Sequence, residues 1–296
     1  MLSQIKTIAL IGLEGYLIDV QTDIAKGMPS YDVVGLPDTT VREAKERIKA
    51  AIKNSKVEFP TQKVLVNLAP ANIKKEGSDF DLPMAIGLLI AIGQISPTVQ
   101  KDLVNTVFVG ELSLSGKVNR VNGVLPMCIE AKNLGIKKVV IPEANCYEAS
   151  VVEGLEVIPV KSLRQVINYL NGKEKIESFK YVEKNEVENT TKTDMDFSEV
   201  KGQERTKRAL EIAAAGGHNC LLVGSPGTGK SMLAKRLPTI LPNLSPEESL
   251  EITKIHSIAG KITSGTALIK TRPFINPHHT ISAISLIGGG RIPKPR

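Results

Sequence analysis

The chain has 296 residues, of which 42% are hydrophobic and 23% charged, and it carries a formal net charge of +7. This length suits about two domains, each large enough to bury its own core. No apolar run approaches the roughly 20 residues of a membrane span, and residues 1–13 lack the basic region and cleavage site of a secretory signal. We therefore expect a cytoplasmic globular protein and no membrane partner.

The positive charge is unevenly distributed. Residues 1–170 and 171–200 carry net charges of +1 and −3, whereas residues 201–296 hold 14 basic against 5 acidic residues. A basic excess of this kind suits a nucleotide site and a nucleic-acid surface. The alternative is that acidic residues elsewhere in a longer chain balance it.

The three cysteines, Cys128, Cys146 and Cys220, are an odd number and lack the spacing of metal ligands. We expect reduced, buried thiols.

Apolar runs and turn residues predict a mixed order of strands and helices in the first 170 residues. Strands are expected at 5–13, 16–20, 30–36, 63–69, 106–112, 138–141 and 156–159. Helices are expected at 40–52, 81–95, 123–134, 143–152 and 162–170. Thr40 and Glu43 have the spacing of a capping box at the first helix, and the helix at 81–95 is apolar enough to be buried. This order predicts an α+β or α/β layered fold.

The polar, charged stretch 171–195 is typical of a linker. We therefore predict one domain over 1–170 and the beginning of a second over 196–296.

The second domain contains a phosphate-binding loop. Residues 220–223 form an apolar run that predicts a short buried strand, and a helical pattern begins at Met232. Between them the sequence matches G-x-x-x-x-G-K-[ST], whose glycines let backbone N–H groups face phosphate oxygens. The candidate residues are Gly224, Ser225, Pro226, Gly227, Thr228, Gly229, Lys230 and Ser231. Lys230 would reach the β- and γ-phosphates of ATP, and Ser231 would ligate Mg²⁺.

The residues around this loop resemble the magnesium-chelatase-like branch of the AAA+ ATPases, and within it the ComM-like competence proteins. The resemblance rests on 196–203, on Gly217-His218-Asn219 before the loop, and on the stretches at 272–274, 277–282 and 288–290. It implies that Gly202 and Gln203 pack beside the adenine ring.

A P-loop ATPase needs a second acidic motif at the end of another strand. After Ser231 the only acidic residues are Glu247, Glu248 and Glu251, which have the pattern of a solvated first helical turn. In the family this motif comes shortly after the triple glycine at 288–290. We therefore expect weak nucleotide binding, little or no hydrolysis, and no catalytic residue in the chain as it stands.

His278 and His279 are the residue type that binds zinc, but adjacent side chains on an extended loop point apart and nothing completes a ligand set. The resemblance implies instead a loop that lines a ring or contacts substrate.

The first half resembles the proteolytic domain of Lon proteases, through residues 110–118, Gly123, Ala131 and 135–145. That resemblance implies a ribosomal-protein-S5-domain-2-like fold. Lon uses a Ser–Lys dyad, but Asp79 stands at the serine position, with Ser78 one place early, and Leu125 stands at the lysine position. We expect the fold without the peptidase.

The charged stretch 74–81 precedes the apolar helix. It could contact DNA or a neighbouring subunit, or it could be a solvated loop in which Asp81 caps the helix; we favour the second interpretation.

The family resemblance implies an ATP-driven motor that, in complete form, assembles as a hexameric ring and promotes branch migration on branched or single-stranded DNA. Two other functions stay open, a chelatase-type motor that remodels a protein partner and a non-catalytic nucleotide-binding module.

Overall fold

The structure is a computed structural model that describes residues 2–180, 195–263, 265–278 and 280–282. The chain divides into two compact units. The first unit contains residues 2–180 and returns for Thr253–Ala267, and the second contains residues 195–252 and Leu268–Ser282. The predicted division at 171–195 stays a prediction.

The first unit is built on a seven-stranded mixed sheet of order β3-β4-β2-β1-β5-β8-β9. The strands are β1 (Ser3–Ile11), β2 (Glu14–Ala25), β3 (Ser30–Val34), β4 (Lys63–Ala69), β5 (Thr106–Phe108), β8 (Lys138–Pro142) and β9 (Glu156–Val160). The pairs β1–β2 and β2–β4 are antiparallel, and the other four pairs are parallel. The fold is therefore a mixed α/β layer structure, as the element order predicted.

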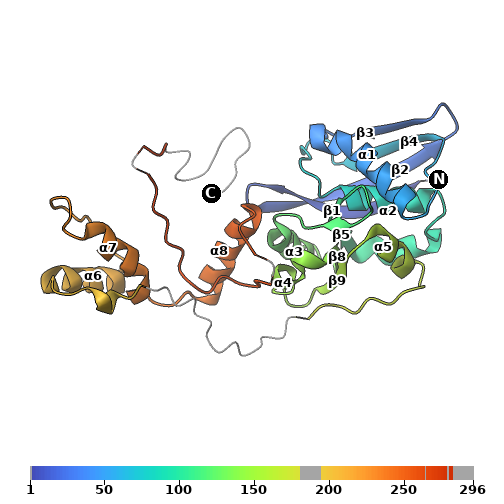
Figure 1. The fold of residues 1–296 in the computed structure, drawn as a ribbon. Helices are drawn as coiled ribbons and strands as arrows, with labels where there is room; N and C mark the ends of the chain where they lie inside the picture. The colour runs from blue at the N-terminus through green and yellow to red at the C-terminus, as the bar shows by residue number, and fades with distance from the viewer. Residues whose placement is uncertain (1, 181–194, 264, 279, 283–296) are drawn as a thin grey trace. The chain divides into compact units, whose positions relative to one another are not determined.

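Helices cover this sheet on both faces (Figure 1). The helices α1 (Thr39–Asn54), α2 (Asp81–Ala91) and α5 (Leu163–Leu170) share one hydrophobic core with the sheet. The helix α3 (Val124–Asn133) contacts β1, β2 and the single-turn helix α4 (Cys146–Ala149). All eleven residues of α2 are buried, which confirms the predicted buried helix.

The N-cap of helix α1 lies two residues earlier than the capping-box pattern predicted. Asp38 is its N-cap, and the Asp38 carboxylate accepts a hydrogen bond of 2.8 Å from the backbone N–H of Val41. The expectation of a capping box at Thr40 is wrong, because Thr40 already lies inside the first turn.

The predicted strand 106–112 is interrupted. β5 ends at Phe108, and a short hairpin of β6 (Glu111–Leu112) and β7 (Val118–Asn119) follows. Gly110 lies between them, where its N–H donates to the Asp79 carbonyl at 3.0 Å and its carbonyl accepts from Leu82 N–H at 2.9 Å. The chain leaves the sheet there because its backbone pairs with the start of α2 instead of a strand. The expected helix at 143–152 is likewise reduced to a 3₁₀ turn, Glu143–Asn145, and α4.

The second unit has a small core of its own. It contains α6 (Glu204–Gly216), α7 (Lys230–Arg236) and the first part of α8 (Pro246–Ile258). Phe197, Val200, Leu210 and Leu233 form the core, with Leu222, Leu237 and Ile240 packed against it. Arg236, the last residue of α7, connects this helix to residues 196–199, because its guanidinium pairs with Glu199 at 2.7 Å and donates to the Asp196 carbonyl at 3.1 Å.

Candidate functional site: the glycine-rich loop

The glycine-rich loop 224–231 leads directly into α7. Gly227 and Gly229 both have left-handed backbone conformations, with φ of 83° and 81°, which favour glycine. Gly229 is the N-cap of α7, and its carbonyl accepts the N–H of Leu233 at 3.0 Å. Residues 226–232 line an open hollow of about 400 Å³. The loop therefore has the shape of an exposed, concave backbone turn at the beginning of a helix.

The Lys230 amine lies across this loop. It donates to the carbonyls of Gly224 at 2.8 Å and Ser225 at 2.7 Å, and to Thr228 Oγ1 at 3.2 Å. The Thr228 hydroxyl in turn donates to the Ser225 carbonyl at 2.9 Å. These contacts hold the amine of Lys230, which is the one cationic residue of 224–231, close to the loop backbone, and Lys230 also lines the hollow. Ser231 follows on the first turn of α7 and is exposed.

Gln203 connects the predicted adenine segment to the loop. Its side-chain amide donates to the Thr228 carbonyl at 3.1 Å and lies 3.4 Å from the position that a Cβ on Gly229 would take. Gly202 and Gln203 both have left-handed backbones, with φ of 68° and 56°, immediately before α6. The structure thus brings Gln203 beside the loop, with Gly202 next to it in the chain.

The predicted buried strand at 220–223 is wrong for the described structure. Residues 220–223 form no strand or helix, and Leu221 and Val223 are 87% and 86% exposed. Only Leu222 packs onto the core of the unit. A central strand needs neighbouring strands to bond its backbone and cover its side chains, and the described residues of the second unit contain none. Cys220 is exposed for the same reason, so the expectation of three buried thiols holds only for Cys128 and Cys146.

The three glutamates after Ser231 lie on the first turns of α8 and are exposed, as predicted. Ser245 and Glu248 form a capping box there, with hydrogen bonds of 3.2 and 2.9 Å, and Glu248 pairs with Arg272 at 3.0 Å.

The His278 side chain forms a hydrogen bond of 2.7 Å between its Nδ1 atom and Thr280 Oγ1. His279 and the glycines at 288–290 lie outside the described residues. Among the described residues, no group of three or more His, Cys, Asp or Glu side chains could hold a metal ion.

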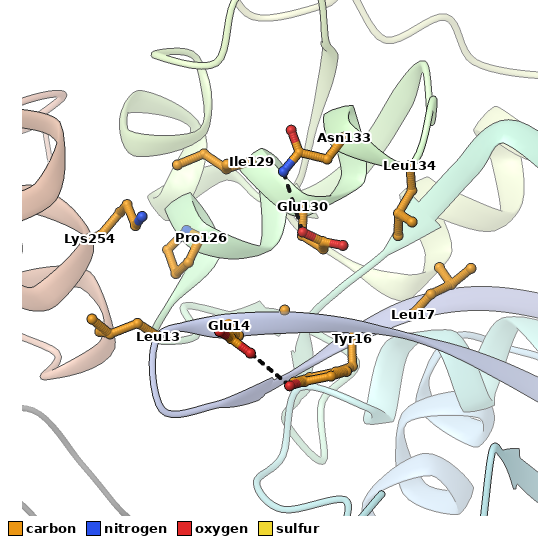
Figure 2. Close-up of a pocket in the computed structure, with 11 residues that line it drawn as sticks. Leu13, Glu14, Tyr16, Leu17, Pro126, Ile129, Glu130, Asn133, Leu134 and Lys254 are labelled. Atoms are coloured by element: carbon orange, nitrogen blue, oxygen red, sulfur yellow. Dashed lines mark hydrogen bonds between the residues drawn. The ribbon is translucent and has the colours of Figure 1, made fainter. Parts of the chain in front are cut away.

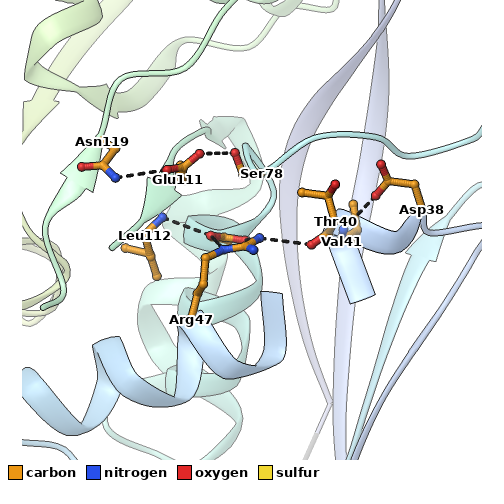
Figure 3. A network of polar contacts seen from close by, with 9 residues as sticks. Asp38, Thr40, Val41, Arg47, Ser78, Glu111, Leu112 and Asn119 are labelled. Atoms are coloured by element: carbon orange, nitrogen blue, oxygen red, sulfur yellow. Dashed lines mark hydrogen bonds and ion pairs between the residues drawn. The ribbon is translucent and has the colours of Figure 1, made fainter. Parts of the chain in front are cut away.

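The two positions that correspond to the Lon dyad are occupied by residues that differ from a serine and a lysine. The Leu125 side chain is fully buried at the start of α3, and the Ser78 hydroxyl donates to the Glu111 carboxylate (Figure 3). The pKa of Asp79 is raised to about 7, first by burial and then by the negative charges of Asp81, Asp38 and Glu111. A leucine cannot act as a base, so these residues offer no Ser–Lys dyad.

The stretch 74–81 is not a solvated loop. The Lys75 side chain is fully buried, and its amine donates to the Gly35 carbonyl at 2.9 Å and to the Pro70 carbonyl. Asp81 does not cap α2 but accepts two hydrogen bonds from Arg47, at 2.7 and 2.9 Å (Figure 3). Periodicity could not reveal either contact, since both depend on residues far apart in the sequence.

A second hollow, of about 570 Å³, opens in the first unit between the β1–β2 hairpin, α3 and Lys254 (Figure 2). Its walls are of mixed polar and apolar character, and four of its polar side chains form two hydrogen-bonded pairs. Glu14 accepts a hydrogen bond from the Tyr16 hydroxyl at 2.8 Å, and Glu130 accepts one from Asn133 at 3.4 Å. This hollow lacks the glycine-rich backbone and the cation of the loop at 224–231.

Within the part of the chain that the structure describes, no helix has both the length and the apolar character needed to cross a membrane.

Comparisons with known proteins agree over both halves of the chain. A family described as "Subunit ChlI of Mg-chelatase" matches residues 20–145, and one described as "Magnesium chelatase, subunit ChlI" matches residues 196–296. The Escherichia coli protein YifB is 42% identical over 294 residues, which cover 99% of this chain and 56% of YifB. Competence protein ComM of Haemophilus influenzae is 38% identical over 288 residues, 97% of this chain and 56% of ComM.

The chain thus spans about half the length of these relatives. An archaeal Lon protease from Methanocaldococcus jannaschii is 26% identical over 152 residues, 51% of this chain and 22% of the protease.

Proposed function

The chain belongs to the magnesium-chelatase-like family that includes ComM, a family of ATPase type, and on that premise we propose that its loop 224–231 binds the phosphates of ATP together with Mg²⁺. The observation that carries this proposal is the Lys230 amine, which hydrogen bonds to Gly224, Ser225 and Thr228 hold beside a glycine-rich turn whose residues line a hollow. Backbone N–H groups in such a turn and a fixed ammonium together suit phosphate oxygens.

The residue roles follow from this placement. Lys230 would neutralise the β- and γ-phosphates, and Ser231 would supply a hydroxyl ligand to Mg²⁺. Gly227 and Gly229 permit the backbone conformation, while Gln203 supports the loop through the Thr228 carbonyl. Gly202 and Gln203 would lie near the adenine end of the nucleotide.

The test is a titration of the full chain with a fluorescent ATP analogue and Mg²⁺. Lys230→Ala should weaken binding by at least about tenfold, because one charge-assisted contact to phosphate is worth about 1.5–3 kcal/mol. Lys235→Ala is the matched control, since Lys235 is exposed in the same helix and makes no contact with the loop. Equal affinities for the two variants would contradict the proposal. Ser231→Ala should lower the affinity in Mg²⁺ more than in EDTA.

Hydrolysis is a separate matter. The acidic residues after Ser231 lie on α8, exposed and in part paired with Arg272, and none contacts the loop among the described residues. We therefore expect this chain to bind ATP with little release of phosphate. Turnover above about one per minute would contradict that expectation, since P-loop catalysis needs a carboxylate to order Mg²⁺ and water.

For a protein with the full length of these relatives we propose an ATP-driven ring, of six subunits, that moves branched or single-stranded DNA in the cytoplasm. We further propose that residues 1–170 have the S5-domain-2-like fold and serve without peptidase activity, that 171–195 act as a linker, and that 196–296 begin a P-loop ATPase domain. The similarity of nearly the whole chain to competence protein ComM favours this proposal over a chelatase-type motor acting on a protein partner.

DNA binding discriminates between these functions. The basic excess of residues 201–296 predicts that the chain binds a four-way junction with an affinity that falls steeply with salt. A chelatase-type motor would show no preference for a junction over a linear duplex of the same length in a fluorescence-anisotropy competition.

A further inference from the structure

Four basic residues follow one face of α1 in the first unit. Arg42, Lys45, Lys49 and Lys53 are three or four residues apart, so that they lie next to one another along the helix. With a rise of about 1.5 Å per residue, the row is about 16 Å long and neighbouring residues are about 4.5–6 Å apart along the helix axis. We call these four residues the basic row.

The charges of the basic row are not neutralised within the first unit. Arg47, which lies off this row in the same helix, pairs with Asp81 at 2.7 Å. By contrast, no side chain of the basic row forms an ion pair or hydrogen bond within the described part of the chain, and all but Lys45 are exposed. Because residues 1–170 carry a net charge of only +1, the row is a local concentration of positive charge and not part of a generally basic domain.

The first unit presents the basic row on a fixed support. The apolar side of α1 consists of fully buried residues: Val41, Ala44, Ile48, Ala51 and Ile52. These residues share one core with α2 and the sheet, and α1 lies beside α2 and β3 (Figure 1). The four charges are therefore held at a fixed spacing before any ligand arrives, which lowers the ordering cost of binding.

The composition of α1 indicates which class of ligand fits the basic row. A row of unpaired cations suits a row of phosphates, and each strand of duplex DNA supplies one phosphate per about 3.4 Å of its axis. The helix contains no aromatic residue on which an unpaired base could stack. Its apolar side chains are buried in the core, so none of them can enter a lipid surface. Contacts to the backbone of a duplex, without readout of the bases, fit these features best.

We propose that the basic row of α1 binds the phosphate backbone of duplex DNA, independently of base sequence and of nucleotide at the loop 224–231. In naming DNA as the ligand, this inference rests on the proposed function, which it deepens by giving the first unit its own surface for that partner. The basic excess of residues 201–296 is then a separate source of affinity for DNA, and variants in α1 distinguish the two.

The test is fluorescence anisotropy of a labelled linear duplex, titrated with the full chain without nucleotide at several salt concentrations. The double variant Lys49→Gln, Lys53→Gln should weaken binding at least about tenfold near about 0.1 M salt, because each phosphate contact releases a counterion. The slope of log K against log salt concentration should become shallower by about 2. Glutamine has nearly the helix propensity of lysine, so α1 should remain folded. The matched control is Lys132→Gln, Lys137→Gln, at two exposed lysines in and after the last turn of α3.

A variant with the opposite effect excludes loss of folding as the explanation. Glu46 borders the basic row, four residues after Arg42 and three before Lys49. Glu46→Gln removes a negative charge beside the row and should strengthen duplex binding about twofold, which an unfolded chain could not do. Glu153→Gln, at an exposed glutamate elsewhere in the first unit, should leave the affinity unchanged.

Equal affinities and salt slopes for the lysine double variant and its control would overturn the basic row, and DNA binding by residues 201–296 would still stand. Absence of duplex binding by the wild-type chain would overturn both, while the nucleotide titration would still decide on the loop. Weaker binding by the double variant, with no preference for a junction, would support the basic row and contradict the proposed DNA motor. Equally tight binding of polyglutamate, with the same loss in the double variant, would assign the row to acidic polypeptides and overturn the choice of DNA.

Discussion

At the scale of single residues, Arg47 and Asp81 form a bidentate ion pair that joins α1 to α2. The Asp81 side chain is fully buried, and Leu112 N–H donates to it as well, at 3.2 Å. Burial raises the pKa of Asp81, whereas the hydrogen bonds from Arg47 lower it. The hydrogen bonds from Arg47 therefore offset part of the cost of burying the Asp81 carboxylate, and this compensation requires both residues.

Replacement of one residue of the Arg47–Asp81 pair should lower the free energy of unfolding. Arg47→Ala leaves a buried carboxylate without its cation and should lower the free energy of unfolding by about 3 kcal/mol. Arg42→Ala, in the same helix but exposed, should change it by less than about 0.5 kcal/mol. Urea unfolding followed by circular dichroism measures both, and equal effects would show that the pair does not hold the helices together.

Asp79 should make stability depend on pH. Its pKa is raised to about 7 in the folded chain, so the folded state keeps a proton that the unfolded state releases between about pH 4 and pH 7. The free energy of unfolding should therefore fall as pH rises through this window.

Asp79→Asn removes that titration. The stability of this variant relative to the wild type should grow by roughly 1–2 kcal/mol between pH 5 and pH 7.5. The exposed Asp32→Asn serves as control and should follow the wild type. Parallel pH profiles for Asp79→Asn and the wild type would contradict the assigned environment.

At the scale of elements, the sequence predicts best those strands and helices whose bounds and buried faces depend on residues close together in the chain. The strand Lys63–Ala69 has the predicted bounds, and the buried faces of α1 and α2 follow their apolar pattern. The misplaced elements are those decided by distant partners. Gly110 leaves the sheet because its backbone meets the beginning of α2, and 220–223 is not a strand because no strand lies beside it among the described residues.

The position of the α1 cap can be tested with two variants. Asp38→Ala removes the hydrogen bond to Val41 N–H and should cost about 1 kcal/mol. Thr40→Ala, which the capping-box pattern would make the damaging change, should cost less than about 0.5 kcal/mol. If Thr40→Ala lowered the free energy of unfolding more than Asp38→Ala, as measured by urea unfolding, Thr40 would be the N-cap that the sequence pattern predicted.

Variants in the stretch 220–223 can likewise distinguish the exposed segment of the structure from the buried strand that the sequence predicted. Leu221→Asn and Val223→Asn should change the stability by less than about 0.5 kcal/mol, because both side chains lie in solvent. Leu222→Ala should cost about 1–2 kcal/mol, since Leu222 packs on the core of the second unit. The reverse order in thermal unfolding would indicate a buried strand, as periodicity suggested.

At the scale of the whole molecule, the sequence indicates where the glycine-rich loop lies in the chain, but not which distant residues contact it. The loop 224–231 is recognisable because its backbone needs fixed glycines at short spacing. Its hydrogen bond with Gln203, and the hydrogen bond from Ser257 to Glu148 in the first unit, join residues far apart in sequence, and only the folded chain brings them together. The return of Thr253–Ala267 to the first unit leaves no local pattern that could have revealed it.

The most direct measurement of the central claim is hydrogen exchange of the full chain with and without ATP and Mg²⁺. Binding at the glycine-rich loop predicts slower exchange of the amides at 224–232 in the wild type, and no such change in Lys230→Ala. Protection confined to other parts of the chain, or protection of this loop that persists in Lys230→Ala, would contradict the account.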